Sequence, residues 1–350
     1  MKKKSDLKSH GLESNDLRLT LKGSIYNSSD GPTNGMWMSE YDVIVIGSGP
    51  AGLTAAIYAG RALVKTLVVG GRTTGGQLML TSGVENFPGF ADAVQGPALM
   101  TEMRKQAERF GAEIIDEDID AVDFSSKPLK VTVGKRVHSG KTIIIATGSS
   151  AKWLGLPSET RLRGKGVSSC ATCDGYFFRG KRVVVVGGGD TAIEEALFLT
   201  KYATEVIVVH RRAELRASKI MQRRALSNEK IRFAWNAVVE EVLGANKVEG
   251  VKIRDVKTGA VSIISSDGVF VAIGHQPNTH VFGGQIALDE KGYIVAKETR
   301  TSIDGVFVAG DVRDFRYRQA VTAAGEGCKA AMDALAYLEE QKEVTVTARG

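Results

Sequence analysis

The sequence YDVIVIGSGPAG at residues 41–52 joins a short apolar run to a glycine-rich turn, and an alanine-rich stretch follows. The run predicts a strand, the turn a tight connection and the alanine-rich stretch a helix. Gly47, Gly49 and Gly52 have the G-x-G-x-x-G spacing, in which glycine permits the tight turn and lets backbone N–H groups approach a pyrophosphate. The positive end of the following helix favours the same negative charge, so these residues predict a dinucleotide site.

The same pattern of strand, turn and helix recurs at residues 182–199. Its fingerprint is Gly187, Gly189 and Ala192, and alanine is a permitted variant at the third position. Two such units predict an α/β fold with two Rossmann-like, three-layer nucleotide-binding domains, the second inserted into the first. The expected parts are a disordered extension at 1–38, a discontinuous first domain at 39–150 and 281–340, an inserted domain at 151–280 and a tail at 341–350.

The two fingerprints differ at their ribose positions. About 20 residues beyond the fingerprint, an NAD site carries an acid that binds the ribose hydroxyls. The first site has Gly-Gly-Arg at residues 70–72 instead, so its ribose must be held differently. The second has Arg211, Arg212 and Arg216, whose fixed charges suit a 2′-phosphate and predict a preference for NADPH. The alternative for these arginines is a solvated basic turn.

Two cysteines lie between the fingerprints, in the sequence Cys170-Ala171-Thr172-Cys173-Asp174. Zinc needs four ligands, and no second CxxC or closely spaced histidine pair completes a set, so we expect no metal. Beside two dinucleotide fingerprints, the pair indicates a redox-active centre that cycles between dithiol and disulfide. The carboxyl group of Asp174 either transfers protons as thiol and thiolate interchange or caps a helix.

Composition excludes several classes of function. The 350 residues are 43% hydrophobic, enough to furnish two domain cores, and no apolar stretch is long enough to span a membrane. The formal charge of +6 comes from 46 basic and 40 acidic residues, a mild bias that gives little support to nucleic-acid binding. Three cysteines are too few for a secreted disulfide framework, so we expect a reducing, cytoplasmic environment.

The first 38 residues differ from the rest of the chain. They are polar, show no sustained apolar periodicity and are expected to be disordered. They lack the apolar core of a secretory signal, and Asp6, Glu13 and Asp16 argue against a transit peptide, although organellar import through this extension stays open. A cloning extension or an early start codon is the favoured explanation, because Met38 precedes the first expected strand.

Two further side chains have structural interpretations. Cys328 lies in a late alanine-rich segment that predicts a helix, and we expect it to be a small buried hydrophobe. His275 follows an apolar run and either lines a cofactor edge or is a satisfied structural histidine, which is the favoured interpretation.

Taken together, the motifs of this chain resemble those of the low-molecular-weight thioredoxin reductases. They occur in the family's order and spacing, and the resemblance covers nearly all of residues 40–340. The motifs are GSGPAG at 47–52, GGQL at 75–78, VENFPG at 84–89, CATCDG at 170–175, GGGDTA at 187–192, HRR at 210–212, AGDV at 309–312 and RQAVTAAGEG at 318–327.

The resemblance implies a homodimeric flavoenzyme that binds FAD in the discontinuous domain and NADPH in the inserted one, and that reduces thioredoxin. Cys173 would face the flavin, Cys170 would attack the protein disulfide and Asp174 would be the acid/base residue. The FAD contacts carried over by motif are Gly47, Gly49, Pro50, Ala51, Gly52, Gly75, Gly76, Gln77, Leu78, Asn86, Gly148, Gly310, Asp311, Arg318, Gln319 and Ala320. The NADPH contacts are Gly187, Gly189, Asp190, Thr191, Arg211, Arg212 and Arg216.

Some alternatives stay open. A related flavin-dependent disulfide reductase would take electrons from another donor or pass them to another acceptor, and a flavin-binding redox sensor would use the dithiol without turnover. The chain carries neither the fused thioredoxin module of some plastid relatives nor the Cys-x4-Cys pair of the high-molecular-weight reductases. We therefore expect the electrons to leave to a separate protein.

Overall fold

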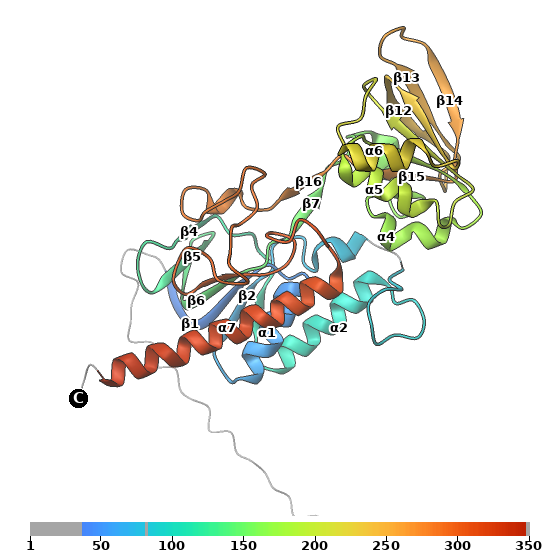
Figure 1. Cartoon of the computed structure of the whole chain (residues 1–350). Helices are drawn as coiled ribbons and strands as arrows, with labels where there is room; N and C mark the ends of the chain where they lie inside the picture. The colour runs from blue at the N-terminus through green and yellow to red at the C-terminus, as the bar shows by residue number, and fades with distance from the viewer. Residues whose placement is uncertain (1–36, 81–82, 348–350) are drawn as a thin grey trace, which may run out of the picture. The chain divides into compact units, whose positions relative to one another are not determined.

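The computed structural model describes residues 37–80 and 83–347, which form two sheets with parallel cores, two smaller antiparallel sheets and the helices around them (Figure 1). The first sheet contains β1 (Trp37–Ile46), β2 (Thr66–Val69), β3 (Glu113–Ile115), β4 (Ala121–Asp123), β5 (Leu129–Val133), β6 (Arg136–Ile145) and β17 (Val306–Val308). Its strand order is β3-β2-β1-β6-β5-β4, and β17 also pairs with β6. Strands β1, β2, β3, β6 and β17 pair in parallel, while β4, β5 and β6 form an antiparallel meander.

The second parallel sheet has the strand order β11-β10-β9-β15-β8. Its strands are β8 (Val167–Ser168), β9 (Arg182–Val186), β10 (Glu205–His210), β11 (Ile231–Trp235) and β15 (Gly268–Val271). An antiparallel sheet of β12 (Ala237–Leu243), β13 (Gly250–Asp255) and β14 (Val261–Ser265) follows β11. A ribbon of β7 (Ser149–Ala151) and β16 (His275–Pro277) pairs the segments that lead into and out of this part of the chain.

The helices connect the parallel strands. They are α1 (Pro50–Arg61), α2 (Gly96–Arg109), α3 (Pro157–Leu162), α4 (Ala171–Asp174), α5 (Asp190–Leu199), α6 (Lys219–Leu226) and α7 (Ala320–Thr347). Three short 3₁₀ turns lie at Gly76–Leu80, Gly175–Phe178 and His280–Phe282 within the described residues. Helices α1, α2 and α7 lie together on one face of the first sheet (Figure 1).

The apolar run at β1 is explained by burial on both faces of the sheet. Successive side chains of a strand point to opposite faces. Val43 and Val45 pack against α1, α2 and α7, whereas Ile44 and Ile46 pack in a second cluster on the other face. A parallel strand covered on both sides is therefore continuously apolar rather than alternating.

The predicted α/β class with two Rossmann-like sheets is confirmed, and the predicted domain bounds stay a prediction. Strand β1 begins at Trp37, inside the predicted extension 1–38, because residues 37–41 pair with β6. Helix α7 runs to Thr347, well into the predicted tail at 341–350. The prediction of disorder for residues 1–36 lies outside the described residues.

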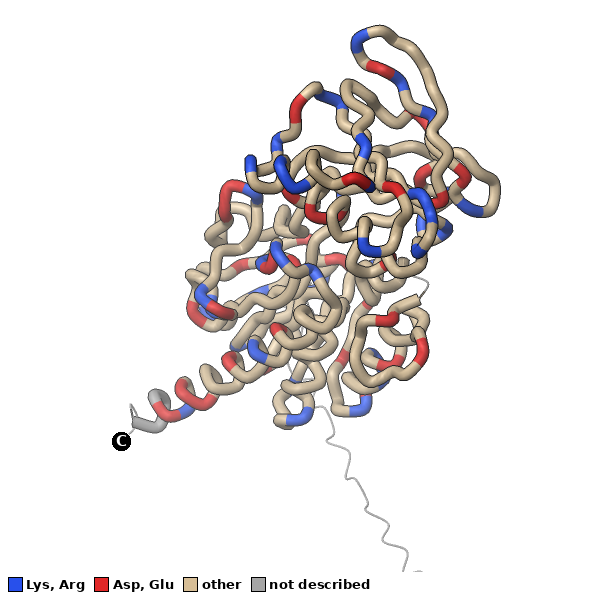
Figure 2. The backbone as a smooth tube through the Cα atoms, turned by 45° about the vertical axis from the view of Figure 1, so that its right-hand side comes forward, with Lys and Arg blue, Asp and Glu red and all other residues tan. Residues whose placement is uncertain are grey.

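Charged residues of both signs are interspersed along the chain (Figure 2), as the near balance of 46 basic and 40 acidic residues leads one to expect. Among the helices of the described part, none is long and apolar enough to cross a membrane.

Candidate functional site

A cavity of about 1010 Å³ brings together segments that are far apart in the sequence. The first fingerprint, the loop after β6 and the segment from Ala309 to Ala323 line one part of it. The cysteine pair and one face of α5 line another part. Its volume lies at the upper end of the range of small-molecule sites, which is about 300–1,000 Å³.

The first fingerprint forms a tight turn whose glycines are required by close backbone contacts. Gly47 has a φ of +113°, and a Cβ atom on it would lie 2.3 Å from the carbonyl oxygen of Ala146. A Cβ atom on Gly52 would lie 1.9 Å from the carbonyl oxygen of Gly47. Gly49 faces open space at the start of α1, and no side chain caps that helix. The N-terminus of α1 is therefore left open to an anionic ligand.

Most of the residues expected to contact FAD line this cavity. They are Gly47, Gly49, Pro50, Ala51, Gly76, Gln77, Leu78, Asn86, Gly148, Gly310, Asp311, Arg318, Gln319 and Ala320. Gly52 and Gly75 do not line it. Gly52 instead packs α1 against the turn, and a Cβ atom on Gly75 would lie 2.7 Å from the side chain of Met79.

The cavity contains polar groups that can form hydrogen bonds with a ligand. Burial and repulsion from Asp314, partly opposed by the positive charge of Arg318, raise the pKa of Asp311 to about 7. Ser149 lines the cavity, and its buried Oγ has no hydrogen-bond partner among the described residues. Together with the open helix N-terminus, these groups fit a ligand that carries phosphates and ribose hydroxyls, as FAD does.

The two cysteines form a disulfide at the start of α4, with Cα atoms 5.3 Å apart. The backbone N–H of Cys173 donates to Sγ of Cys170 at 3.2 Å, and Oγ1 of Thr172 lies 3.3 Å from the same sulfur. Both cysteines line the cavity and are partly exposed. Hydrogen-bond donors stabilise a thiolate, so these contacts would favour the thiolate of Cys170 once the disulfide is opened.

Asp174 ends α4, and its side chain caps neither that helix nor the 3₁₀ turn that follows it. The capping alternative for this residue is therefore wrong. Burial raises the pKa of Asp174, and a hydrogen bond with Ser168 opposes part of that rise. A carboxyl group with a raised pKa beside a dithiol is suited to hold a proton that a thiolate can take.

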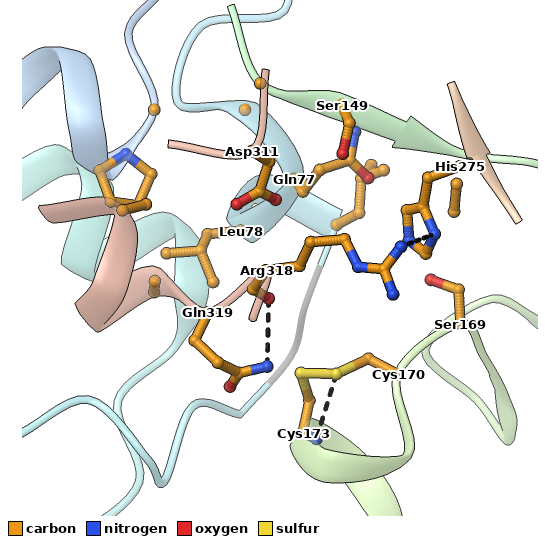
Figure 3. Close-up of a pocket in the computed structure, with 18 of the residues that line it drawn as sticks. Gln77, Leu78, Ser149, Ser169, Cys170, Cys173, His275, Asp311, Arg318 and Gln319 are labelled. Atoms are coloured by element: carbon orange, nitrogen blue, oxygen red, sulfur yellow. Dashed lines mark hydrogen bonds between the residues drawn. A yellow bond between two sulfur atoms is a disulfide. The ribbon is translucent and has the colours of Figure 1, made fainter. Parts of the chain in front are cut away.

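Polar contacts link several of the segments that line the cavity, and Figure 3 shows the one between Arg318 and His275. Arg318 Nη1 lies 2.9 Å from Nδ1 of His275 on β16. Gln319 Nε2 donates to Oγ1 of Thr172 at 3.1 Å, and Asn86 Nδ2 donates to Oε1 of Gln319 at 3.1 Å. Thr172 stands between the two cysteines, so the segment at 318–319 contacts both the β7–β16 ribbon and the CxxC turn.

His275 has a hydrogen-bond partner in Arg318, in accord with the structural interpretation, and it also lines the cavity. Burial, together with the positive charges of Arg318 and Lys152, lowers the pKa of His275 to about 4. The ring is therefore neutral near pH 7, and its Nδ1 can accept a hydrogen bond from the guanidinium.

One face of α5 forms part of the wall, and most of it was missed at the level of sequence. Thr191, Glu194, Glu195 and Phe198 all line the cavity. Burial raises the pKa of Glu195 to about 8, and one of its oxygens has no hydrogen-bond partner among the described residues. These four residues have the spacing i, i+3, i+4 and i+7, which places them on one face of a helix. Because Thr191 is expected to contact a cofactor, this spacing could have predicted that the other three lie at the same site.

The second fingerprint repeats the first. Gly187 has a φ of +151°, and a Cβ atom on it would lie 2.5 Å from the carbonyl oxygen of Ala272. Gly189 faces open space, and no side chain caps α5. The arginines expected to bind the 2′-phosphate are exposed on the loop after β10. Of the residues expected to contact NADPH, Thr191 lines the cavity described above, whereas Gly187, Gly189, Asp190, Arg211, Arg212 and Arg216 lie outside it.

The expectation for Cys328 is wrong. It lies on α7 as expected, but it is partly exposed rather than buried, and its Sγ lies 3.9 Å from Sδ of Met332. It is absent from the cavity lining. Within the described ranges, no group of three His, Cys, Asp or Glu side chains gathers as metal ligands do.

Comparisons with known proteins agree with one another. The family model described as pyridine nucleotide-disulphide oxidoreductase matches residues 41–327. The chain is 53% identical to a thioredoxin reductase of Rickettsia conorii over 304 residues, which make up 85% of this chain and 98% of that one. The solved thioredoxin reductase from Giardia duodenalis has a TM-score of 0.82 at 44% identity, and the match covers 86% of this chain and 99% of that chain. The Lactococcus lactis enzyme, described as in the FR conformation, has a TM-score of 0.59 at 40% identity and the same coverage.

Proposed function

This chain belongs to the pyridine nucleotide-disulphide oxidoreductases and, within them, to the thioredoxin reductases, and we propose that it passes electrons from NADPH through FAD to its own cysteine pair and on to thioredoxin. The reaction balances as NADPH, one proton and oxidised thioredoxin giving NADP⁺ and the dithiol of thioredoxin. The single observation that carries the proposal is that the Cys170–Cys173 disulfide lines the same cavity as the first dinucleotide fingerprint.

The thioredoxin reductases use FAD and NADPH. When bound, FAD supplies the two-electron chemistry between the nicotinamide and the disulfide, which no side chain can supply. The chain's own residues do the rest: the turn at 47–52 would hold the pyrophosphate, and Asp311 would accept hydrogen bonds from hydroxyl groups. An ionised Asp311 is the better acceptor, so bound FAD would favour the loss of its proton.

The two sulfurs would have separate roles. Opening the disulfide takes up two electrons; with one proton it gives one thiolate and one thiol, and with a second proton it gives two thiols. Hydrogen bonds from Cys173 N–H and Thr172 favour the thiolate on Cys170, which would attack the disulfide of thioredoxin. Cys173 would then displace reduced thioredoxin and re-form the disulfide, with Asp174 supplying the proton that the leaving thiolate takes up.

The two fingerprints would belong to two domains, at 39–150 with 281–340 and at 151–280. The β7–β16 ribbon would join them as a hinge, because the chain passes between the two parts there. Such a hinge would account for TM-scores of 0.82 and 0.59 at equal coverage and similar identity. Rotation at the hinge would expose Cys170 to thioredoxin and bring bound nicotinamide to the cavity. Assembly as a homodimer and a cytoplasmic location complete the proposal.

The arginines after β10 carry a prediction for nucleotide preference. Replacing both Arg211→Gln and Arg212→Gln should raise KM for NADPH by about 10- to 100-fold, because two charge-assisted hydrogen bonds to the 2′-phosphate are lost. KM for NADH, which has no 2′-phosphate, should change little. Steady-state kinetics with both donors measures this, and Arg223→Gln on α6 is a matched control with an exposed arginine outside the loop. An equal rise in KM for NADH would show that the arginines do not recognise the 2′-phosphate.

An assay with purified FAD-loaded protein tests the proposed function. NADPH oxidation should depend on oxidised thioredoxin and continue for many turnovers per enzyme. Parallel reactions with NADH, reduced ferredoxin, a glutaredoxin and a peroxiredoxin-linked carrier test the alternative donors and acceptors. Absence of NADPH-dependent thioredoxin reduction beside a competent control reductase would refute the proposal, and a single turnover would indicate a redox sensor.

A further inference from the structure

Asp190 is the first residue of α5 and follows the second fingerprint directly. A carboxylate at this place would repel the pyrophosphate that the helix N-terminus is suited to bind. In the structure it is engaged elsewhere: its Oδ1 accepts a hydrogen bond of 2.8 Å from the backbone N–H of Ser218. Ser218 is the N-cap residue of α6, at the far end of the loop that follows β10.

That loop carries three exposed arginines within residues 211–216, and their like charges repel one another. Backbone contacts tie it to the fingerprint, because the N–H groups of Arg216 and Ala217 both donate to the carbonyl oxygen of Gly188, at 2.7 Å and 3.1 Å. From the other side, Nε2 of Gln222 on α6 donates to the carbonyl oxygen of Ala217 at 2.8 Å. The hydrogen bond that Asp190 accepts from Ser218 is a side-chain contact between α5 and the end of this loop.

The ring of His210 fixes the start of the same loop. It lies directly against the fingerprint, since a Cβ atom on Gly188 would come within 2.3 Å of the ring. Its Nε2 lies 3.0 Å from the carbonyl oxygen of Glu214, which closes the turn that contains the first two arginines. Contacts with His210, Gly188 and Asp190 thus hold the loop in place. The contact with Asp190 is made by a charged side chain and lies at the C-terminal end of the loop.

We propose that Asp190 is a positioning residue for nucleotide specificity, which holds the arginine loop against the fingerprint through Ser218 and does not itself contact the nucleotide. The inference rests on the proposed NADPH site and revises the role expected for Asp190 from the motif. It explains how an acid is tolerated beside a pyrophosphate, because its negative charge is directed to a backbone N–H group. Its loss should weaken the 2′-phosphate contacts and leave the rest of the nucleotide site in place.

Calorimetric titration of the FAD-loaded protein with NADP⁺ and with NAD⁺ tests this. Asp190→Ala should weaken NADP⁺ binding about tenfold, as expected for the loss of one charge-assisted hydrogen bond, and change NAD⁺ binding by less than about twofold. Asp190→Asn should bind NADP⁺ at least as tightly as the unmodified protein, because its amide oxygen still accepts from Ser218. Asp267→Ala is the matched control, since Asp267 accepts from the backbone N–H of Arg182 at the other end of β9.

The outcomes are distinct. Equal weakening of both nucleotides, an unchanged affinity for NADP⁺ in Asp190→Ala, or an asparagine variant that behaves like the alanine variant would each overturn the role of Asp190. If the unmodified protein itself fails to prefer NADP⁺ over NAD⁺, the proposed NADPH site is wrong and the inference falls with it. Far-UV circular dichroism and the flavin spectrum of each variant confirm that it is folded and loaded.

Discussion

Cys170→Ser should abolish the reduction of thioredoxin, lowering turnover on the order of 10³-fold or more, while FAD stays bound and NADPH still reduces it. A serine hydroxyl cannot form a disulfide with Cys173 or attack one in thioredoxin. The effect on stability should be small, because the side chain is partly exposed and keeps its place as the N-cap of α4. Turnover with thioredoxin measures the reduction of thioredoxin, and the absorbance of the flavin after addition of NADPH measures the reduction of FAD.

Trapping of a mixed disulfide assigns the roles of the two sulfurs. Cys173→Ser should also stop turnover, but it leaves Cys170 free to form a stable mixed disulfide with thioredoxin, which non-reducing gel electrophoresis detects. Cys170→Ser should trap none. The opposite pattern would reverse the assignment, and full activity of Cys170→Ser would refute the role of the pair. Cys328→Ser is a suitable control, because that thiol lies outside the cavity and should leave turnover unchanged.

Asp174→Asn should lower thioredoxin-dependent turnover by about 10²- to 10⁴-fold, the usual contribution of a general acid or base. Burial raises the pKa of Asp174, so the carboxyl group keeps its proton to a higher pH than an exposed aspartate does. Proton donation is complete below this pKa and is lost as the pH rises through it. The turnover rate of the unmodified enzyme should therefore fall as the pH rises through that pKa. The pH–rate profile of the asparagine variant should lack this falling limb.

The pH dependence separates a chemical role from a structural one. Measurement of kcat for thioredoxin reduction across the pH range, with flavin content checked at each pH, is the test. Asp267→Asn removes an exposed carboxylate from the same part of the chain and should keep both the rate and the limb. If Asp174→Asn retains the limb, another group titrates, and if it retains the rate, Asp174 is not the acid.

The fold and the cofactors could be predicted from sequence because their signals are local. The glycine spacing of each fingerprint lies within one short stretch of sequence, although Gly47 and Gly187 also contact the backbone of Ala146 and Ala272, which are distant in sequence. The apolar run at β1 reports burial on both faces of a parallel sheet. The CxxC pair is contiguous, and the family resemblance, which the relatives confirm, adds FAD, NADPH and thioredoxin.

The remaining features depend on long-range contacts that no local pattern records. Arg318 meets His275 and Gln319 meets Thr172 across 43 and 147 residues of sequence. The raised pKa of Glu195 arises from burial in a cavity that several segments build together. The fingerprint predicted a nucleotide contact for Asp190, and the contact with Ser218, which lies 28 residues away, could not be read from it. Likewise, β1 begins at Trp37 because β6 extends far enough to pair with it.

The central claim is that the Cys170–Cys173 disulfide opens and closes on the path from NADPH to thioredoxin. The most direct measurement is an anaerobic absorbance titration of the FAD-loaded protein, with protein thiols counted at each step. The account predicts that NADPH bleaches the flavin and yields two new thiols at Cys170 and Cys173, and that oxidised thioredoxin then restores both the colour and the disulfide. A flavin that bleaches while these two sulfurs stay joined, or that thioredoxin cannot reoxidise, would contradict it.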